Sequence, residues 1–147
     1  MALSCHALSD PKIDALGRVP LFAGCSRKEL EFLVTRTDAV AVPAGQTLIK
    51  QGRPGDTFYV LLDGEASVQV DGRDRPSLRA GSFFGEIGML DRGPATATVV
   101  TTSPAHLMVM SHAQFRDAIK ANDQLLLQVM IAMAKRLRRD LQDLKPA

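Results

Sequence analysis

The sequence predicts an α+β fold, namely a jelly-roll-like antiparallel β-roll flanked by N-terminal helices and two C-terminal helices. From Asp38 to Met110 the chain consists of short β-rich segments separated by closely spaced turn residues, a pattern typical of sandwiches and jelly rolls. Helical periodicity occurs before and after this region. Because strands do not alternate with long helices, a parallel doubly wound sheet is not expected.

The length and composition indicate one globular domain. A chain of 147 residues can bury a core, and its 46% hydrophobic and 23% charged residues are ordinary proportions. The formal net charge of +2 is too small to indicate nucleic-acid binding by itself. We expect a single domain over residues 1–147, with poor order over 1–11, the β-roll over 38–110 and the C-terminal helices over 111–143.

Two helices are expected ahead of the β-roll. The first covers Lys12 to Gly17 and is stopped by Gly17 and Pro20. The second begins with a capping box, because Ser26 is followed three residues later by Glu29. This second helix continues to about Thr35 and carries its apolar residues on one face.

The β-roll contains two strong turn signals. Asp63-Gly64 and Asp71-Gly72 each separate two β-rich segments, and both pairs predict hairpins because Asp and Gly accept positive φ. The expected strands are Ala39–Val42, Thr47–Gln51, Thr57–Leu62, Glu65–Val70, Ser77–Ala80, Thr96–Thr101 and His106–Met110.

Two helices are expected after the β-roll. Ser111 can cap a helix that extends to about Lys120, and Asn122 or Asp123 can cap a longer helix that extends to about Asp143. Apolar residues recur along the longer helix at intervals of three or four, which predicts either a core-facing stripe or a seam with a second copy of the chain. These residues are Leu126, Met130, Met133, Leu137, Leu141 and Leu144.

The segment from Phe83 to Val99 is the candidate functional region. Glu86 is a lone carboxylate among apolar residues, and a buried carboxylate needs a partner. A sugar diol is one suitable partner. Gly85 and Gly88 allow the backbone to approach a ligand closely, and a short helix begun at Gly85 would direct free N–H groups at an anion. The segment is therefore suited to a ligand that carries both a sugar and a phosphate.

This segment resembles the phosphate-binding cassette of the cyclic nucleotide-binding domain family, the sensor domains of cyclic AMP and cyclic GMP. The family pattern F-G-E-[LI]-[AG]-L-L, followed by P-R-[AST]-A-[TS]-V, is matched with one departure, at Ala95. The matching residues are Phe84, Gly85, Glu86, Ile87, Gly88, Met89, Leu90, Pro94, Thr96, Ala97, Thr98 and Val99. Further glycines and aromatics follow the family pattern in order, at Gly45, Gly52, Gly55-Asp56, Phe58-Tyr59, Gly64 and Gly81.

The resemblance implies a binding site and a function. The family's cassette glutamate, here Glu86, accepts a hydrogen bond from the ribose 2′-hydroxyl, and backbone N–H groups from Gly85 to Gly88 bond the phosphate and ribose. Thr96 is compatible with guanine as well as adenine. The implied ligand-binding residues are Phe84, Gly85, Glu86, Ile87, Gly88, Ala95, Thr96 and Ala97. The implied function is that of a stand-alone regulatory module that binds cyclic AMP or cyclic GMP and signals through its last helix.

Ala95 stands where the family has the arginine that pairs with the cyclic phosphate. A hydrogen bond to a charged group contributes roughly 1.5–3 kcal/mol, so its loss weakens binding about 10- to 100-fold unless another group compensates. Arg92 and Arg79 are the candidates for such a group. The alternative is an interaction module that has kept the fold and lost the ligand.

Other classes of protein have less support. His6, His106 and His112 lack the spacing of a cupin-type metal site, and no nucleophilic set indicates an enzyme. We expect no metal or other cofactor. The longest apolar run is too short for a membrane span, and we expect no signal peptide, because the first residues lack a basic start followed by an apolar stretch.

The remaining features point to a cytoplasmic protein that binds another protein. Cys5 and Cys25 indicate free thiols. Lys135, Arg136, Arg138 and Arg139 form a basic cluster on the last helix, which we interpret as a solvated face. The family's transcription factors continue into a helix-turn-helix domain, whereas this sequence ends at Ala147, so nucleic-acid binding is not expected. The expected partner at the last helix is an unidentified protein or a second copy of the chain.

Overall fold

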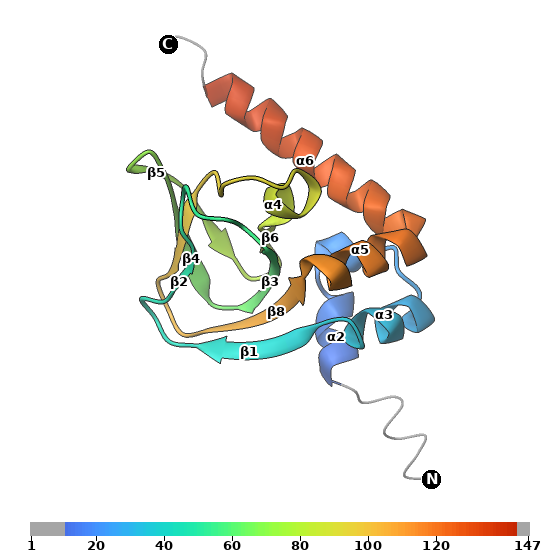
Figure 1. The fold of residues 1–147 in the computed structure, drawn as a ribbon. Coiled ribbons are helices and arrows are strands. Elements are labelled where there is room, and N and C mark those ends of the chain that lie inside the picture. The colour runs from blue at the N-terminus through green and yellow to red at the C-terminus, as the bar shows by residue number, and fades with distance from the viewer. Residues whose placement is uncertain (1–10, 144–147) are drawn as a thin grey trace.

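The computed structural model describes residues 11–143, and within them the strands form two four-stranded antiparallel sheets that face each other as a β-roll (Figure 1). One sheet has the order β1-β8-β3-β6 and the other the order β2-β7-β4-β5. The predicted fold class is confirmed. The strands are β1 (Asp38–Val42), β2 (Thr47–Ile49), β3 (Thr57–Asp63), β4 (Glu65–Val70), β5 (Arg73–Arg79), β6 (Phe83–Phe84), β7 (Thr98–Thr101) and β8 (Ala105–Ser111).

Helices gather at one end of the β-roll, and the last of them crosses its side. In Figure 1, α2, α3 and α5 lie together, while α6 runs from this group past α4 toward β5. The helices are α2 (Pro11–Gly17), the 3-10 helix η1 (Pro20–Phe22), α3 (Arg27–Val34), α4 (Glu86–Leu90), α5 (His112–Ala121) and α6 (Asp123–Asp143). Of the segment 1–11 expected to be poorly ordered, Pro11 is the first residue of α2 and the rest lies outside the described residues.

Capping boxes begin two of these helices. At α3, the Glu29 N–H donates to Ser26 Oγ at 3.1 Å, and the Ser26 N–H donates to Glu29 Oε1 at 2.8 Å. At α5, Ser111 and Gln114 make the same reciprocal pair, at 3.2 and 2.8 Å. Each box satisfies two N–H groups that a helix start would otherwise leave unpaired, which confirms both predicted helix starts.

Replacing Ser26 with alanine is expected to lower the free energy of unfolding by about 1 kcal/mol, because the Glu29 N–H loses its acceptor. Urea unfolding followed by circular dichroism measures the change. Ser77→Ala is the control, since Ser77 is an exposed residue of β5 and is expected to change stability by less than about 0.5 kcal/mol. Equal effects of the two substitutions would show that the cap contributes nothing.

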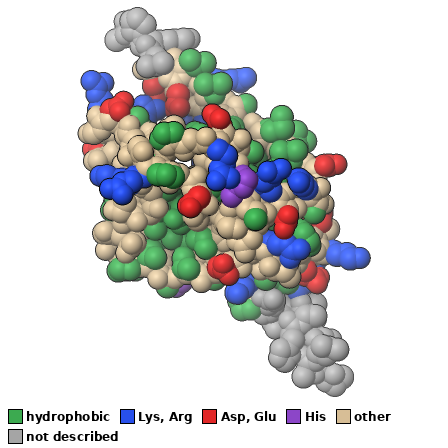
Figure 2. Space-filling model, viewed as in Figure 1, with side chains coloured by type: hydrophobic (Ala, Val, Ile, Leu, Met, Phe, Trp, Pro, Cys, Tyr) green, Lys and Arg blue, Asp and Glu red, His purple; other side chains and the backbone are tan. Residues whose placement is uncertain are grey.

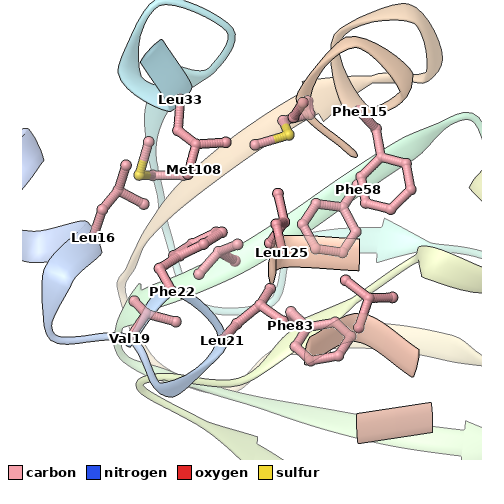
Figure 3. Close-up of a cluster of buried hydrophobic side chains, with 14 of the residues drawn as sticks. Leu16, Val19, Leu21, Phe22, Leu33, Phe58, Phe83, Met108, Phe115 and Leu125 are labelled. Atoms are coloured by element: carbon pink, nitrogen blue, oxygen red, sulfur yellow. The ribbon is translucent and has the colours of Figure 1, made fainter. Parts of the chain in front are cut away.

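The main core lies between the helical end and the sheet that contains β3 and β8 (Figure 3). Phe58 of β3 is its centre, with ring centroids 4.7 Å from Phe115 and 5.7 Å from Phe83. Leu125 and Val129 bring the first two turns of α6 into this cluster. A second cluster fills the interior of the β-roll and includes Leu61, Phe84 and Leu107. The start of α6 is thus anchored by apolar packing.

The apolar stripe predicted on α6 is only partly buried. The buried residues of α6 are Leu125 and Val129, and neither belongs to the predicted stripe. Met130, Leu137 and Leu141 are instead exposed, while Leu144 lies outside the described residues. Of the predicted residues, Met133 is half-buried and packs against the main core. The exposed residues form an apolar row that the rest of the described structure leaves uncovered. No helix within residues 11–143 combines the length and apolar character needed to cross a membrane.

One predicted hairpin is wrong. Asp71-Gly72 joins the paired strands β4 and β5, with φ of 53° and 76° at the two residues. Asp63-Gly64 instead joins β3 to β4, which belong to different sheets. Gly64 has a φ of +98°, and a Cβ there would lie 2.9 Å from the Cα of Ala105. The pair therefore forms a tight corner between the sheets, because an Asp-Gly turn does not determine which strands become partners.

Smaller differences concern strand boundaries. Strand β5 begins at Arg73 rather than Ser77, directly after the Asp71-Gly72 turn, because pairing with β4 begins at that turn. Strand β7 begins at Thr98, which leaves Thr96 and Ala97 in the preceding loop.

Candidate functional site

A cavity of about 240 Å³ lies between the β-roll, α4 and the second half of α6. All eight predicted ligand-binding residues line it, so the fold brings both ends of segment 83–99 to one place. These residues are Phe84, Gly85, Glu86, Ile87, Gly88, Ala95, Thr96 and Ala97. Their role in binding stays a prediction. The predicted ligand-binding set did not include the other lining residues, which are Ile49, Gly55, Val68, Val70, Arg75, Pro76, Leu78, Val99, Arg136, Arg139 and Asp140.

Two glycines allow segment 83–99, hereafter the cassette, to pack directly on neighbouring backbone. Gly85 precedes α4 with a φ of +89°, and a Cβ at this position would overlap the carbonyl oxygen of Thr57. A Cβ at Gly88 would overlap the carbonyl of Gly55. Backbone so close leaves no room for a side chain, and the φ of Gly85 disfavours other residues. The glycines therefore fix α4 against β3 and the loop before it.

Glu86 is the buried charge of the cavity, with 2% of its surface exposed. Its Oε1 accepts a hydrogen bond from Nη1 of Arg136, while Nη2 of Arg136 donates to the carbonyl oxygen of Phe83. The guanidinium also lies over the Phe83 ring, 4.6 Å from the centroid, in a cation–π arrangement. The partner that a buried carboxylate requires is thus an arginine of α6, fifty positions away in the sequence.

The structure corrects the interpretation of the basic cluster at one residue. Arg136 does not lie on a solvated face but pairs with Glu86, whereas Arg138 is exposed. The charge run alone does not distinguish these arginines. The available signal was the lone Glu86, whose burial required a cation from elsewhere in the chain.

An aromatic pair supports the cassette from behind. The Phe84 ring stacks on Tyr59 of β3, with centroids 4.9 Å apart. The Tyr59 hydroxyl donates to the carbonyl of Leu48 at 3.1 Å, and burial raises the pKa of Tyr59 above its ordinary value. The hydroxyl therefore remains a neutral donor at physiological pH, and the floor of the cavity beneath Phe84 is held in place.

Ala95 is fixed by its backbone. Its N–H donates to the Arg53 carbonyl at 2.7 Å, and its carbonyl accepts from the Gly52 N–H at 2.9 Å. These bonds place an uncharged methyl group in the cavity wall. Neither Arg79 nor Arg92, the expected substitutes for the missing arginine, lines the cavity.

The charged side chains around the cavity come from α4, β5 and α6. Arg75 of β5 pairs with Asp140 at 2.7 Å and with Asp143 at 3.7 Å, and Arg136 pairs with Glu86. Beyond Val129, these ion pairs join α6 to the β-roll. On the face shown in Figure 2, basic, acidic and hydrophobic side chains are interspersed rather than gathered by type.

The cysteine and the two histidines among the described residues, Cys25, His106 and His112, do not line this cavity. Cys25 is a free thiol whose pKa is raised by burial, and Asn122 Nδ2 donates to its Sγ at 3.3 Å. Cys5 and His6 lie outside the described residues. Among residues 11–143, no three His, Cys, Asp or Glu side chains are grouped so that they could hold a metal ion.

Comparison with known proteins identifies the family. The sequence model described as "Cyclic nucleotide-binding domain" matches residues 39–122, which is more than half of the chain. The chain therefore belongs to the cyclic nucleotide-binding domain family, as the cassette residues predict.

Individual relatives agree with this assignment. The cAMP-dependent protein kinase regulatory subunit of Aspergillus niger is 34% identical over 103 residues, which are 69% of this chain and 25% of that protein. The CRP-like cAMP-activated global transcriptional regulator of Mycobacterium tuberculosis is 28% identical over 131 residues, which are 86% of this chain and 58% of that protein. The chain thus spans a quarter of the first relative and somewhat more than half of the second.

A solved structure has the same fold. The crystal structure of Thermus thermophilus catabolite activator protein matches with a TM-score of 0.77 at 24% identity, over 85% of this chain and 61% of that chain. At this identity the likeness concerns the fold alone.

Proposed function

We propose that this domain is a stand-alone regulatory module that binds cyclic AMP or cyclic GMP and signals through α6. The observation that carries the proposal is the cavity itself, which brings together all eight predicted ligand-binding residues, among them the buried carboxylate of Glu86. A carboxylate in a cavity is a suitable acceptor for a ribose hydroxyl. The Aspergillus relative is described as cAMP-dependent and the Mycobacterium relative as cAMP-activated, which supports a cyclic nucleotide as the ligand. The proposed role is binding and regulation rather than catalysis, in the cytoplasm.

The contacts of Glu86 offer a route from the ligand to α6. Glu86 faces the cavity and also pairs with Arg136 of α6, so a ligand that bonds Glu86 changes the surroundings of this ion pair. A ligand shifts a conformational equilibrium only by its difference in affinity for the two arrangements. In the proposed module this difference arises where the ligand meets Glu86 and α6.

A second candidate function is an interaction module that does not bind a nucleotide. Ala95 favours it, because the cassette wall lacks a cation. The uncovered apolar row on α6 favours it too, with Met130, Leu137 and Leu141 each more than half exposed. The partner would be another protein or a second copy of this chain, joined along α6.

Calorimetric titration with cyclic AMP and cyclic GMP tests the proposal, with Ala95→Arg measured in parallel. We expect the unaltered domain to bind one of the two nucleotides, and Ala95→Arg to bind it about 10- to 100-fold more tightly. Ala44→Arg is the matched control, since Ala44 lies exposed in the turn between β1 and β2, and it should leave the affinity unchanged.

The outcomes separate the two candidates. Absence of binding in both the unaltered domain and Ala95→Arg would overturn the proposed function and favour the interaction module. Sedimentation of the same samples would then show whether the partner is a second copy of the chain.

A further inference from the structure

We propose that Arg136 of α6 supplies the positive charge for the ligand's phosphate that the cassette lacks at Ala95. The Glu86–Arg136 ion pair then acts as one recognition unit, in which the carboxylate accepts from the 2′-hydroxyl and the guanidinium donates to the neighbouring phosphate. The inference rests on the proposed function, because it names the residue by which that same cavity binds the anion.

Position distinguishes Arg136 from the other arginines of the cavity. Arg136 contacts two cassette residues, Glu86 and Phe83. Arg75 belongs to β5 and is held by Asp140 and Asp143. Arg139 lies about 4.5 Å farther along α6, toward those aspartates, by the rise of an α-helix. Arg136 is thus the lining cation that directly contacts the cassette.

Arg136 and Glu86 have capacity left for a ligand. A guanidinium carries five N–H donors, and the contacts with Glu86 and the Phe83 carbonyl use one from each terminal nitrogen. An ionised carboxylate has about four acceptor positions on two oxygens. Arg136 is also accessible, since 34% of its side chain is exposed. The pair can therefore bind a hydroxyl and a phosphate without giving up its own ion pair.

The ligand's chemistry matches this pair. In a 3′,5′-cyclic nucleotide the 2′-hydroxyl and the 3′-phosphate ester are on adjacent ribose carbons, so groups that bind them must also be adjacent. A carboxylate joined to a guanidinium meets this condition, and arginine is well suited to phosphate oxygens. Ala95 contributes only a methyl group to the cavity wall.

The charges of the residues that line the cavity are also compatible with an anionic ligand. The ionised side chains of the cavity are three arginines and two carboxylates, namely Arg75, Arg136, Arg139, Glu86 and Asp140. Among the lining residues, arginines therefore outnumber carboxylates by one, while Asp143, which also pairs with Arg75, lies just outside the lining; a cyclic phosphodiester carries one negative charge.

The test measures cyclic AMP and cyclic GMP affinity of Arg136→Gln by calorimetry in two backgrounds. In the unaltered domain we expect binding to weaken about 10- to 100-fold. In the Ala95→Arg background the same substitution should cost less than about 3-fold, because the cassette then carries its own cation. A merely structural role, holding α6 in place, would cost the same in both backgrounds. Arg138→Gln is the matched control, since Arg138 is exposed on the same helix and should leave affinity unchanged.

Several results would overturn the inference while leaving the proposed function intact. One is equal affinity of Arg136→Gln and Arg138→Gln, and another is an equal loss in both backgrounds. Failure of the unaltered domain to bind either nucleotide would contradict the proposed function itself. If Ala95→Arg then bound a nucleotide, Arg136 would also be excluded as an effective substitute for an arginine at position 95. Arg136→Lys, which keeps the charge, should retain more affinity than Arg136→Gln if the charge is what the ligand requires.

Discussion

Gly85→Ala is expected to lower the free energy of unfolding by about 2–5 kcal/mol. The φ of +89° at Gly85 costs a residue with a Cβ about 1–2 kcal/mol, and the overlap of that Cβ with the Thr57 carbonyl adds about 1–3 kcal/mol of overpacking. Thermal unfolding measured by calorimetry should show a lower midpoint. Because Gly85 is the residue from which α4 starts as its N-cap, nucleotide affinity should fall as well.

Gly45→Ala separates the two contributions to this loss. Gly45 has a similar φ of +84°, but nothing lies within 4 Å of the position that its Cβ would occupy. It should therefore show the backbone cost alone, about 1–2 kcal/mol. If Gly85→Ala is no more destabilising than Gly45→Ala, the close approach of the cassette to β3 does not restrict residue 85.

Phe58→Ala is expected to lower the free energy of unfolding by about 3–5 kcal/mol, the usual cost of truncating a buried aromatic residue. Phe58 is 1% exposed and its ring meets those of Phe83 and Phe115, so the truncation leaves a cavity between the sheet and α5. Urea unfolding gives the change from the transition midpoint and slope.

Leu137→Ala is the matched control for this core truncation. Leu137 is 60% exposed on α6, and its truncation should change stability by no more than about 0.5 kcal/mol. A comparable loss in both variants would mean that α6 is buried against something in solution, such as a second copy of the chain.

Local patterns in the sequence predict much of this fold. The capping box at Ser26 and the cap at Ser111 depend on residues at most three positions away, and both form as expected, with Gln114 completing a second box at Ser111. The Asp71-Gly72 hairpin is equally local. Asp63-Gly64 shows the limit of such patterns, because the pairing of β3 with β8 and of β4 with β7 is decided by distant strands.

The candidate site likewise contains residues that the sequence predicts and residues that it does not. The eight predicted ligand-binding residues are close in sequence and belong to one motif, so the sequence predicts them together, and all of them line one cavity. Arg136 could not be identified, since its pairing with Glu86 spans fifty residues and depends on the angle at which α6 crosses the β-roll. Lys135 and Arg138 have the same local character, and only the packing of α6 decides which cation faces the cavity.

The shallow anchoring of α6 has a consequence for how this domain can diversify. Its buried residues, Leu125 and Val129, occupy the first two turns, and the remaining turns contribute no fully buried side chain to either core cluster. Exposed substitutions usually change stability little. Outside the ion-paired residues, the exposed face of α6 beyond Val129 can therefore acquire a new binding specificity with little loss of folding stability.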